Sequence, residues 1–447
     1  MSWERWNHWT LVDLPELNRS VLSGREPAAN LTAALRRALT DDLPLPETFP
    51  PDQAKRLLVL LGLAGSSVAR HYQEADPARS AHPAWSFGRL TVGPAKVPFA
   101  LYFARLADAS RTGHPPRDCY ASLVRWNAPT TVVEADGEAL AVLPGSFADG
   151  ETRTYTGDPG EIAFFALLKK SEALERAVND VLEPIAQGEV EPLSPDAVDR
   201  ALLAARLMAA LIRVNQEFAA APPELGGLST EHCLDAFRRF AVHWEAGDLP
   251  PTGAQDPEFL RRDFLLGIAF PGYPEHVRRI YPSLLGSERD MLDRHSVRPP
   301  LPETLLSSLK LDADELARCT EDRARELVRA HPQLAAWYLL LAANAEFGAV
   351  HLMLTDRILY KPERERDLSA DADRNPVSNQ RDTIGIEEPL LVRLALARRD
   401  HLLRGLGRLP HRELSAACGA DSGHEIDAGW EGAWTDRLPT VRFAEAA

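Results

Sequence analysis

The sequence predicts an all-α fold, and three observations lead to this prediction. Apolar residues recur at helical spacing along most of the 447 residues. Strand-like alternation is scarce and is confined to "YASLVRW" and "TTVVEA" between 120 and 135, where a short ribbon is predicted. Apolar runs also begin with helix-start signals, as at Ser194, which can cap a helix, and Pro195, which suits a first turn.

The apolar periodicity places the helices along the chain. It predicts them at 30–40, 53–72, 160–184, 196–221, 230–245, 257–269, 312–330, 333–360 and 386–405. Proline-rich joints between several of these runs mark connections, because proline cannot continue a helix. These joints lie at 42–51, 114–117, 221–224, 249–252 and 298–302.

The sharpest change of composition is "RTGHPPRD" at 111–118, which predicts a domain boundary. We therefore expect a small, mainly helical N-terminal region at 1–114 and a large helical domain at 115–405. The segment 406–447 lacks periodicity and is expected to be an irregular tail. A polar stretch at 361–384 is also expected to be irregular, and loops of this length often cover a site.

Charge and cysteine content exclude several classes of protein. The formal net charge of −15 disfavours binding to nucleic acid or to an anionic membrane surface. The four cysteines form no CxxC pair, which fits a reducing compartment. We see no signal peptide, and the apolar run at 57–65 is far shorter than the ~20 residues of a membrane span. A soluble, cytoplasmic protein is expected; its oligomeric state is not indicated.

One histidine lies inside a predicted buried helix, in "NAEFGAVHLMLTDRILY" at 344–360. The helix face around His351 is apolar apart from Asn344 and Thr355, and Gly348 lies one turn before it. A missing side chain would let a flat macrocycle approach while the imidazole binds its iron, so His351 is a candidate heme ligand. The alternative is a core histidine bonded to a backbone carbonyl, with Gly348 allowing a close helix crossing.

Other motifs do not offer a competing chemistry. His232 and His243 share a predicted helix face, but no ExxH or HExxH accompanies them, so a zinc or di-iron site is not indicated. The chain also lacks GxGxxG, GxxxxGK[ST] and GxSxG motifs.

Five stretches in order resemble the monodechloroaminopyrrolnitrin synthase family. This family is the pyrrolnitrin-pathway branch of the heme-dependent tryptophan and indoleamine dioxygenase superfamily. The stretches span most of the chain: "LPELNRS" at 14–20, "PPRDCYASLVRWN" at 115–127, "RTYTGDP" at 153–159, "ALERAV" at 173–178 and "FGAVHLML" at 347–354.

The resemblance implies an all-α fold like the dioxygenases, with a helical heme domain and a smaller N-terminal part. It implies heme b as the cofactor, with His351 as the iron ligand and Phe347 and Gly348 beside it. The family's substrate-side tyrosine stands two helical turns after the histidine. Here Leu359 has that spacing and Tyr360 follows it.

The resembling segments supply the candidate site residues. Arg153 and Tyr155 are expected to be catalytic, while Trp126, Asn127, Thr154 and Tyr360 are expected to contact substrate. From the polar stretch, Arg381 would bind a heme propionate or a substrate carboxylate, and Thr383 would contact substrate.

Together with these residues, the resemblance implies a heme-dependent oxidoreductase. It would act on a tryptophan-like or other aromatic amino acid, or a derivative, in secondary-metabolite or antibiotic biosynthesis, with dioxygen or peroxide. The reaction could also require an external electron donor as a partner. Two rival interpretations stay open: a heme enzyme for aromatic hydroxylation or N-oxidation of another substrate, and a non-catalytic helical binding or scaffold protein.

Overall fold

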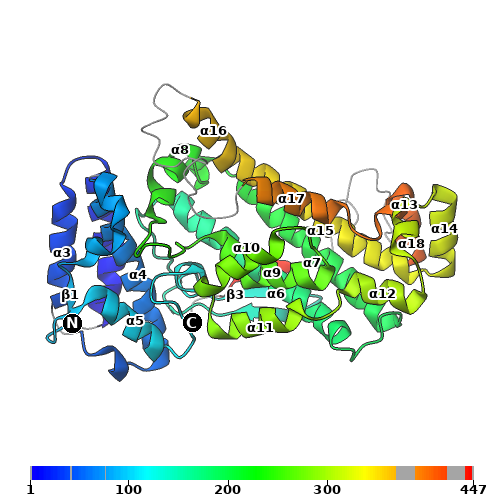
Figure 1. Ribbon diagram of the computed structural model, residues 1–447, viewed down its shortest axis with the longest axis horizontal. Helices are drawn as coiled ribbons and strands as arrows, with labels where there is room; N and C mark the ends of the chain where they lie inside the picture. Colours follow the sequence, from blue (N-terminus) through cyan, green and yellow to red (C-terminus); the bar gives the residue numbers. More distant parts are fainter. Residues whose placement is uncertain (1–2, 41–42, 76, 369–387, 420–437, 445–447) are drawn as a thin grey trace.

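The computed structural model describes residues 3–40, 43–75, 77–368, 388–419 and 438–444. Helices dominate this part of the chain (Figure 1), which confirms the predicted all-α character. The N-terminal helices occupy one end of the molecule. They are α1 (Trp3–His8), α2 (Leu14–Leu22), α3 (Ala28–Thr40), α4 (Pro51–Glu74) and α5 (Phe99–Ala109), with a hairpin of β1 (Thr91–Val92) and β2 (Val97–Pro98).

The remaining helices build the larger part of the molecule. In chain order they are α6 (Pro159–Ala186), α7 (Pro195–Ala220), α8 (Thr230–His232), α9 (Pro257–Leu266), α10 (Tyr273–Ile280), α11 (Gly286–Ser296), α12 (Leu301–Leu309), α13 (Ala313–Arg318), α14 (Glu321–Ala330), α15 (Gln333–Thr355), α16 (Lys361–Asp367), α17 (Glu388–Arg399) and α18 (His411–Ala417).

Three π-helical turns interrupt or extend helices at places that matter for the site. They are η5 (Ala121–Arg125), η7 (Cys233–Phe237) and η11 (Asp356–Tyr360). A π-helical turn holds about one residue more than an α-helical turn and is often found at functional sites.

The two longest helices before α15 begin at caps that the sequence supplies. At α7, the Ser194 hydroxyl accepts a hydrogen bond from the Ala197 N–H, as predicted. At α6, the Asp158 carboxylate accepts one from the Gly160 N–H. Each cap satisfies a backbone donor that has no partner within the helix.

A small antiparallel sheet has the order β4–β3–β5 and joins distant parts of the chain. Its strands are β3 (Thr131–Ala135), β4 (Glu138–Leu143) and β5 (Thr440–Phe443). Asp136 and Gly137 turn between β3 and β4 with φ of 53° and 84°, the conformation of a two-residue hairpin. The ribbon predicted from "TTVVEA" is confirmed, whereas 121–125 is helical.

Buried apolar side chains form two main clusters. One comes mainly from residues 6–126, and the other extends from Val133 to Leu414. Helix α15 lies in the second cluster and packs against α7 and α17, and Figure 1 shows α15 and α17 running side by side. The helical run Gln333–Arg366 is apolar and long enough to cross a membrane, but a buried core helix has the same composition.

The structure corrects several predicted boundaries. The helix expected at 230–245 ends by Phe240, and the one expected at 312–330 breaks into α13 and α14 around Cys319. The expected tail contains α18 and β5, and the start of the expected loop at 361–384 is α16. Most of that loop lies outside the described residues.

Gly348 faces α17 and not open space. A Cβ atom at this position would lie 3.4 Å from the Ala395 Cα and 3.2 Å from the Arg398 Cδ. The glycine therefore permits a close crossing of α15 and α17, which is the alternative that the sequence left open. The expected place of Gly348 beside a macrocycle is corrected accordingly.

This contact predicts that Gly348→Leu destabilises the fold. The added side chain would force α17 away from α15, and overpacking of this kind costs about 1–3 kcal/mol. Chemical denaturation would measure the loss, with Met353→Leu, at an exposed position of α15, as the control. Unchanged stability of Gly348→Leu would contradict the close crossing.

Candidate functional site

A cavity of about 260 Å³ lies beside the C-terminal half of α15. Helix α15 and η11 form one wall, and α6, η5 and η7 form the others. The lining is mainly aromatic and aliphatic, as in most small-molecule sites. Its aromatic members are Tyr120, Tyr155, Phe164, Phe165, Phe237, Phe259, Phe347 and Tyr360.

His351 lines this cavity, with its ring half-buried. The ring stacks on Phe347 at 5.6 Å between centroids and meets the edge of Phe259 at 6.0 Å. Its Nδ1 atom is buried and has no hydrogen-bond partner among the described residues. Burial lowers the pKa of His351 to about 3, and the positive charges of Arg398 and Arg262 add to this effect. The imidazole is therefore neutral at physiological pH.

Three further residues expected at the site reach the same cavity: Phe347, Tyr155 and Tyr360. The Tyr155 ring stacks on the Phe240 ring at 4.2 Å between centroids. Burial raises the pKa of this phenol well above its usual value, so it stays protonated. Tyr155 thus lines the cavity as a buried, neutral aromatic side chain.

Tyr360 reaches the cavity because η11 is a π-helical turn. The additional residue in this turn shifts the following positions by about one, so the ninth residue after His351 takes a place near that of the eighth in a regular helix. Leu359 and Tyr360 both line the cavity, so the tyrosine reaches it although it is one residue later than the position that the resemblance predicts.

Arg153 lies away from the cavity, which corrects its expected place. It is fully buried, pairs with Asp149, hydrogen-bonds Asn7 and lies over the Phe147 ring at 3.5 Å. Burial lowers the pKa of Arg153 despite the partner Asp149. Its guanidinium connects the loop that contains Asp149 to Asn7 in helix α1.

Three more predicted contacts are structural. Trp126 stacks on His114 at 5.3 Å, and the Thr154 hydroxyl accepts a hydrogen bond from the Gly157 N–H. The Asn127 amide exchanges two hydrogen bonds with the backbone of Arg153, at 2.7 and 2.9 Å. None of these side chains lines the cavity. Arg381 and Thr383 lie outside the described residues.

The sequence did not single out the acidic side chains of the cavity. Glu175 and Asp256 line it, and burial raises the pKa of both carboxyl groups. The Tyr120 hydroxyl is 3.4 Å from Asp256 Oδ2. Two sequence signals could have identified these acids. Glu175 lies in the resembling "ALERAV" stretch, and Asp256 precedes the proline that starts α9, which is the position of a helix cap.

Two ion pairs lie behind Phe259 and Phe347. Arg262 Nη1 donates to Glu175 Oε1 at 2.6 Å, and Arg398 pairs with Asp263 at 2.9 Å. Both guanidinium groups also lie against the two phenylalanine rings. Buried guanidinium groups thus pack against the Phe259 and Phe347 rings of the wall beside His351.

Glu161 holds the segment that carries Tyr155. Its carboxylate accepts hydrogen bonds from the N–H groups of Tyr155 and Thr156 and from the Thr156 hydroxyl. His232 Nε2 lies 3.0 Å from Glu161 Oε1, next to the η7 wall of the cavity. Burial alone would lower the pKa of His232, but the hydrogen bond to Glu161 raises it above its usual value.

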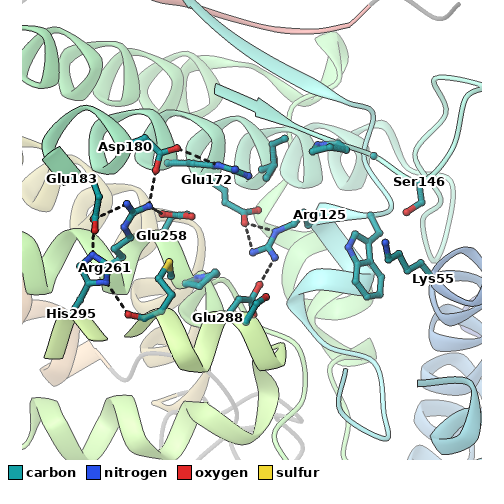
Figure 2. Close-up of a pocket in the computed structure, with 18 of the residues that line it drawn as sticks. Lys55, Arg125, Ser146, Glu172, Asp180, Glu183, Glu258, Arg261, Glu288 and His295 are labelled. Carbon is teal, nitrogen blue, oxygen red and sulfur yellow. Dashed lines mark hydrogen bonds and ion pairs between the residues drawn. The ribbon is translucent and has the colours of Figure 1, made fainter. Parts of the chain in front are cut away.

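A second, more open cleft of about 760 Å³ lies between α4, α6, α9 and α11. Figure 2 shows Arg125 between Glu172 and Glu288, and Arg261 among acidic side chains. Burial alone would raise the Glu183 pKa, but hydrogen bonds, including those from Arg261 and His295, lower it to about 2. The charged groups of this cleft pair with one another, which indicates bracing of the helices.

No protein-family model and no curated protein matches the chain. Within the described residues, no group of three or more histidine, cysteine and acidic side chains is placed to hold a metal ion.

The His232–Glu161 contact predicts a pH-dependent stability. Because folding raises the pKa of His232, the contribution is complete below its unfolded value of about 6.5 and is lost as the pH rises through the folded value. His232→Gln should therefore lower the melting temperature more at about pH 6 than at about pH 9. Equal losses at both pH values would contradict a protonated His232.

Proposed function

We propose that this protein is a heme-dependent oxidoreductase that binds an aromatic substrate in the cavity beside His351. The observation that carries the proposal is a neutral imidazole at the wall of an aromatic cavity, with no hydrogen-bond partner for its Nδ1 among the described residues. Heme iron needs only one ligand from the protein, since the macrocycle supplies the others.

The donor chemistry of the site fits a heme. Coordination needs the neutral form of histidine, and burial together with two arginines keeps His351 in that form. Phe347 and Phe259 fix the direction of the ring through aromatic contacts. The second nitrogen of a ligating histidine usually donates to a carbonyl or carboxylate, whereas Nδ1 of His351 has no such partner among the described residues, so the protonation state and the direction of the ring carry the fit.

When bound, heme would supply the oxidative chemistry with dioxygen or peroxide. The chain would do the rest. The aromatic side chains exclude water and stack on a planar substrate, while Glu175, Asp256 and Tyr120 offer the polar contacts that orient it.

The family resemblance supports the same function. Three of the resembling stretches, "PPRDCYASLVRWN", "RTYTGDP" and "ALERAV", contribute Tyr120, Tyr155 and Glu175 to the cavity that contains His351. The π-helical turn η11 also brings Tyr360 to the cavity despite its offset. We therefore propose membership in the monodechloroaminopyrrolnitrin synthase branch, with a tryptophan-like or related aromatic substrate.

A second function is favoured by the size of the cavity. About 260 Å³ is below the range of roughly 300–1,000 Å³ common for small-molecule sites, so a macrocycle would need the walls to move apart. A heme-free protein that binds a small aromatic ligand would not need this movement. In that case His351 would be a hydrogen-bond partner of the ligand.

The first test is the Soret band of the full chain mixed with hemin. The wild type should show the band of a histidine-ligated heme, and His351→Ala should lose it. His351→Gly should regain it with added imidazole, which replaces the missing ligand.

His276→Ala is the matched control, because His276 is also buried with its pKa lowered to about 4 but lies on α10, outside the cavity lining. A folded His351→Ala protein with an unchanged Soret band would refute the ligand assignment. Absence of hemin binding by the wild type, together with binding of indole, would favour the heme-free protein.

A further inference from the structure

We propose that the Glu175–Asp256 carboxyl pair binds the ammonium group of an arylalkylamine in the aromatic cavity. This inference shares with the proposed function only the assumption that the cavity binds an aromatic ligand. It does not need the heme. It identifies the charged group of the ligand as a cation, whereas the sequence led us to expect a carboxylate held by an arginine.

The first observation is an acidic oxygen without a donor. Glu175 is 2% exposed, and its Oε1 accepts a hydrogen bond from Arg262. Its Oε2 is buried and has no hydrogen-bond partner in the described part of the chain, and Glu175 lines the cavity. A carboxylate oxygen in this condition is unfavourable unless a donor reaches it, and an ammonium group supplies three.

The second observation is the neighbouring acid. Asp256 lines the same cavity as Glu175. Burial, and then the negative charges of Glu175 and Glu172, raise the pKa of Asp256 well above its usual value, which favours a proton on this carboxyl in the ligand-free protein. An ammonium group could replace that proton, since it would donate to both carboxylates.

The charges around the pair do not oppose a cation. Three arginines and Lys169, whose pKa burial lowers to about 7, face five carboxyl groups, so the surroundings carry no excess of positive charge. The cations are Arg125, Lys169, Arg262 and Arg398, and the acids are Glu172, Glu175, Asp256, Asp263 and Glu288.

The cavity offers less to an anion. Arg238 is the cation among its described lining residues, and it pairs at 3.3 Å with Glu363, which is itself buried. Arg153 lies elsewhere, in its pair with Asp149. A carboxylate ligand would therefore meet an arginine whose charge is already balanced, and would also face the Glu175–Asp256 pair.

The aromatic lining completes the site. Phe165, Phe237 and Tyr120 line the same cavity as the acids, so a ring can stack there while a short alkyl chain carries the amine to the pair. Asp256 is held in place because its Oδ1 accepts the N–H groups of Glu258 and Phe259 at the start of α9. The carboxyl pair is thus fixed before a ligand arrives.

Three indoles that differ in one group test the proposal: tryptamine, 3-methylindole and indole-3-propionate. Their affinities for the full chain, with and without added hemin, would be measured by calorimetry. Tryptamine should bind at least about tenfold more tightly than 3-methylindole, since a charge-assisted contact worth about 1.4 kcal/mol gives this ratio. Indole-3-propionate should bind most weakly.

Asp256→Asn is the informative variant, because asparagine caps a helix as well as aspartate does and keeps the size of the side chain. It should weaken tryptamine about tenfold and change 3-methylindole less than about twofold. Glu175→Gln should act in the same direction, and Ser171→Ala, at an uncharged position of the lining, should leave the ratio unchanged.

Equal affinities for tryptamine and 3-methylindole, or a ratio that Asp256→Asn does not alter, would overturn the proposal even if the Soret band is normal. Preferred binding of indole-3-propionate would overturn it as well. A wild type that binds tryptamine selectively but takes up no hemin would leave this inference standing and refute the heme.

Discussion

The ion pairs Arg262–Glu175 and Arg398–Asp263 hold together the wall on which the cavity depends. They join α6, α9 and α17, and their guanidinium groups lie against Phe259 and Phe347. Removing one partner of such a buried pair costs about 3–5 kcal/mol, because the other charge stays buried without compensation. Gly348 belongs to the same arrangement, since it lets α17 come close enough for Arg398 to reach Asp263.

The same charges set the chemistry of His351. The two arginines oppose its protonation, and burial has an even larger effect, so the imidazole keeps a free electron pair at any physiological pH. Phe347 stacks on the histidine and Phe259 meets it edge-on, and both guanidinium groups lie against these two rings. The residues that stabilise the wall therefore also leave a neutral nitrogen that can coordinate a metal or accept a hydrogen bond from a ligand.

The sequence predicted the long helices, including the one that carries His351, because helical periodicity is a local property. It also indicated Phe347, Tyr155 and Tyr360, which line the cavity. It misjudged the direction of Gly348, since the spacing along a helix defines a face but not which neighbour covers it. The π-helical turn η11 could not be recognised either, because one extra residue in a turn leaves no clear sequence signature.

One physical cause explains why the sequence placed Arg153 at the site and did not single out Glu175 and Asp256. Whether a charged side chain faces a ligand or a partner depends on contacts between segments far apart in the chain, such as Arg153 with Asn7, or Glu175 with Arg262.

Once those contacts are known, the charges can be assigned. Every arginine of the wall has an acidic partner. Glu175 pairs with Arg262 and Asp256 caps α9, so both acids also stabilise the fold. Neither role uses Glu175 Oε2, which has no hydrogen-bond partner among the described residues, and this buried oxygen carries a desolvation cost that a donating ligand would reduce.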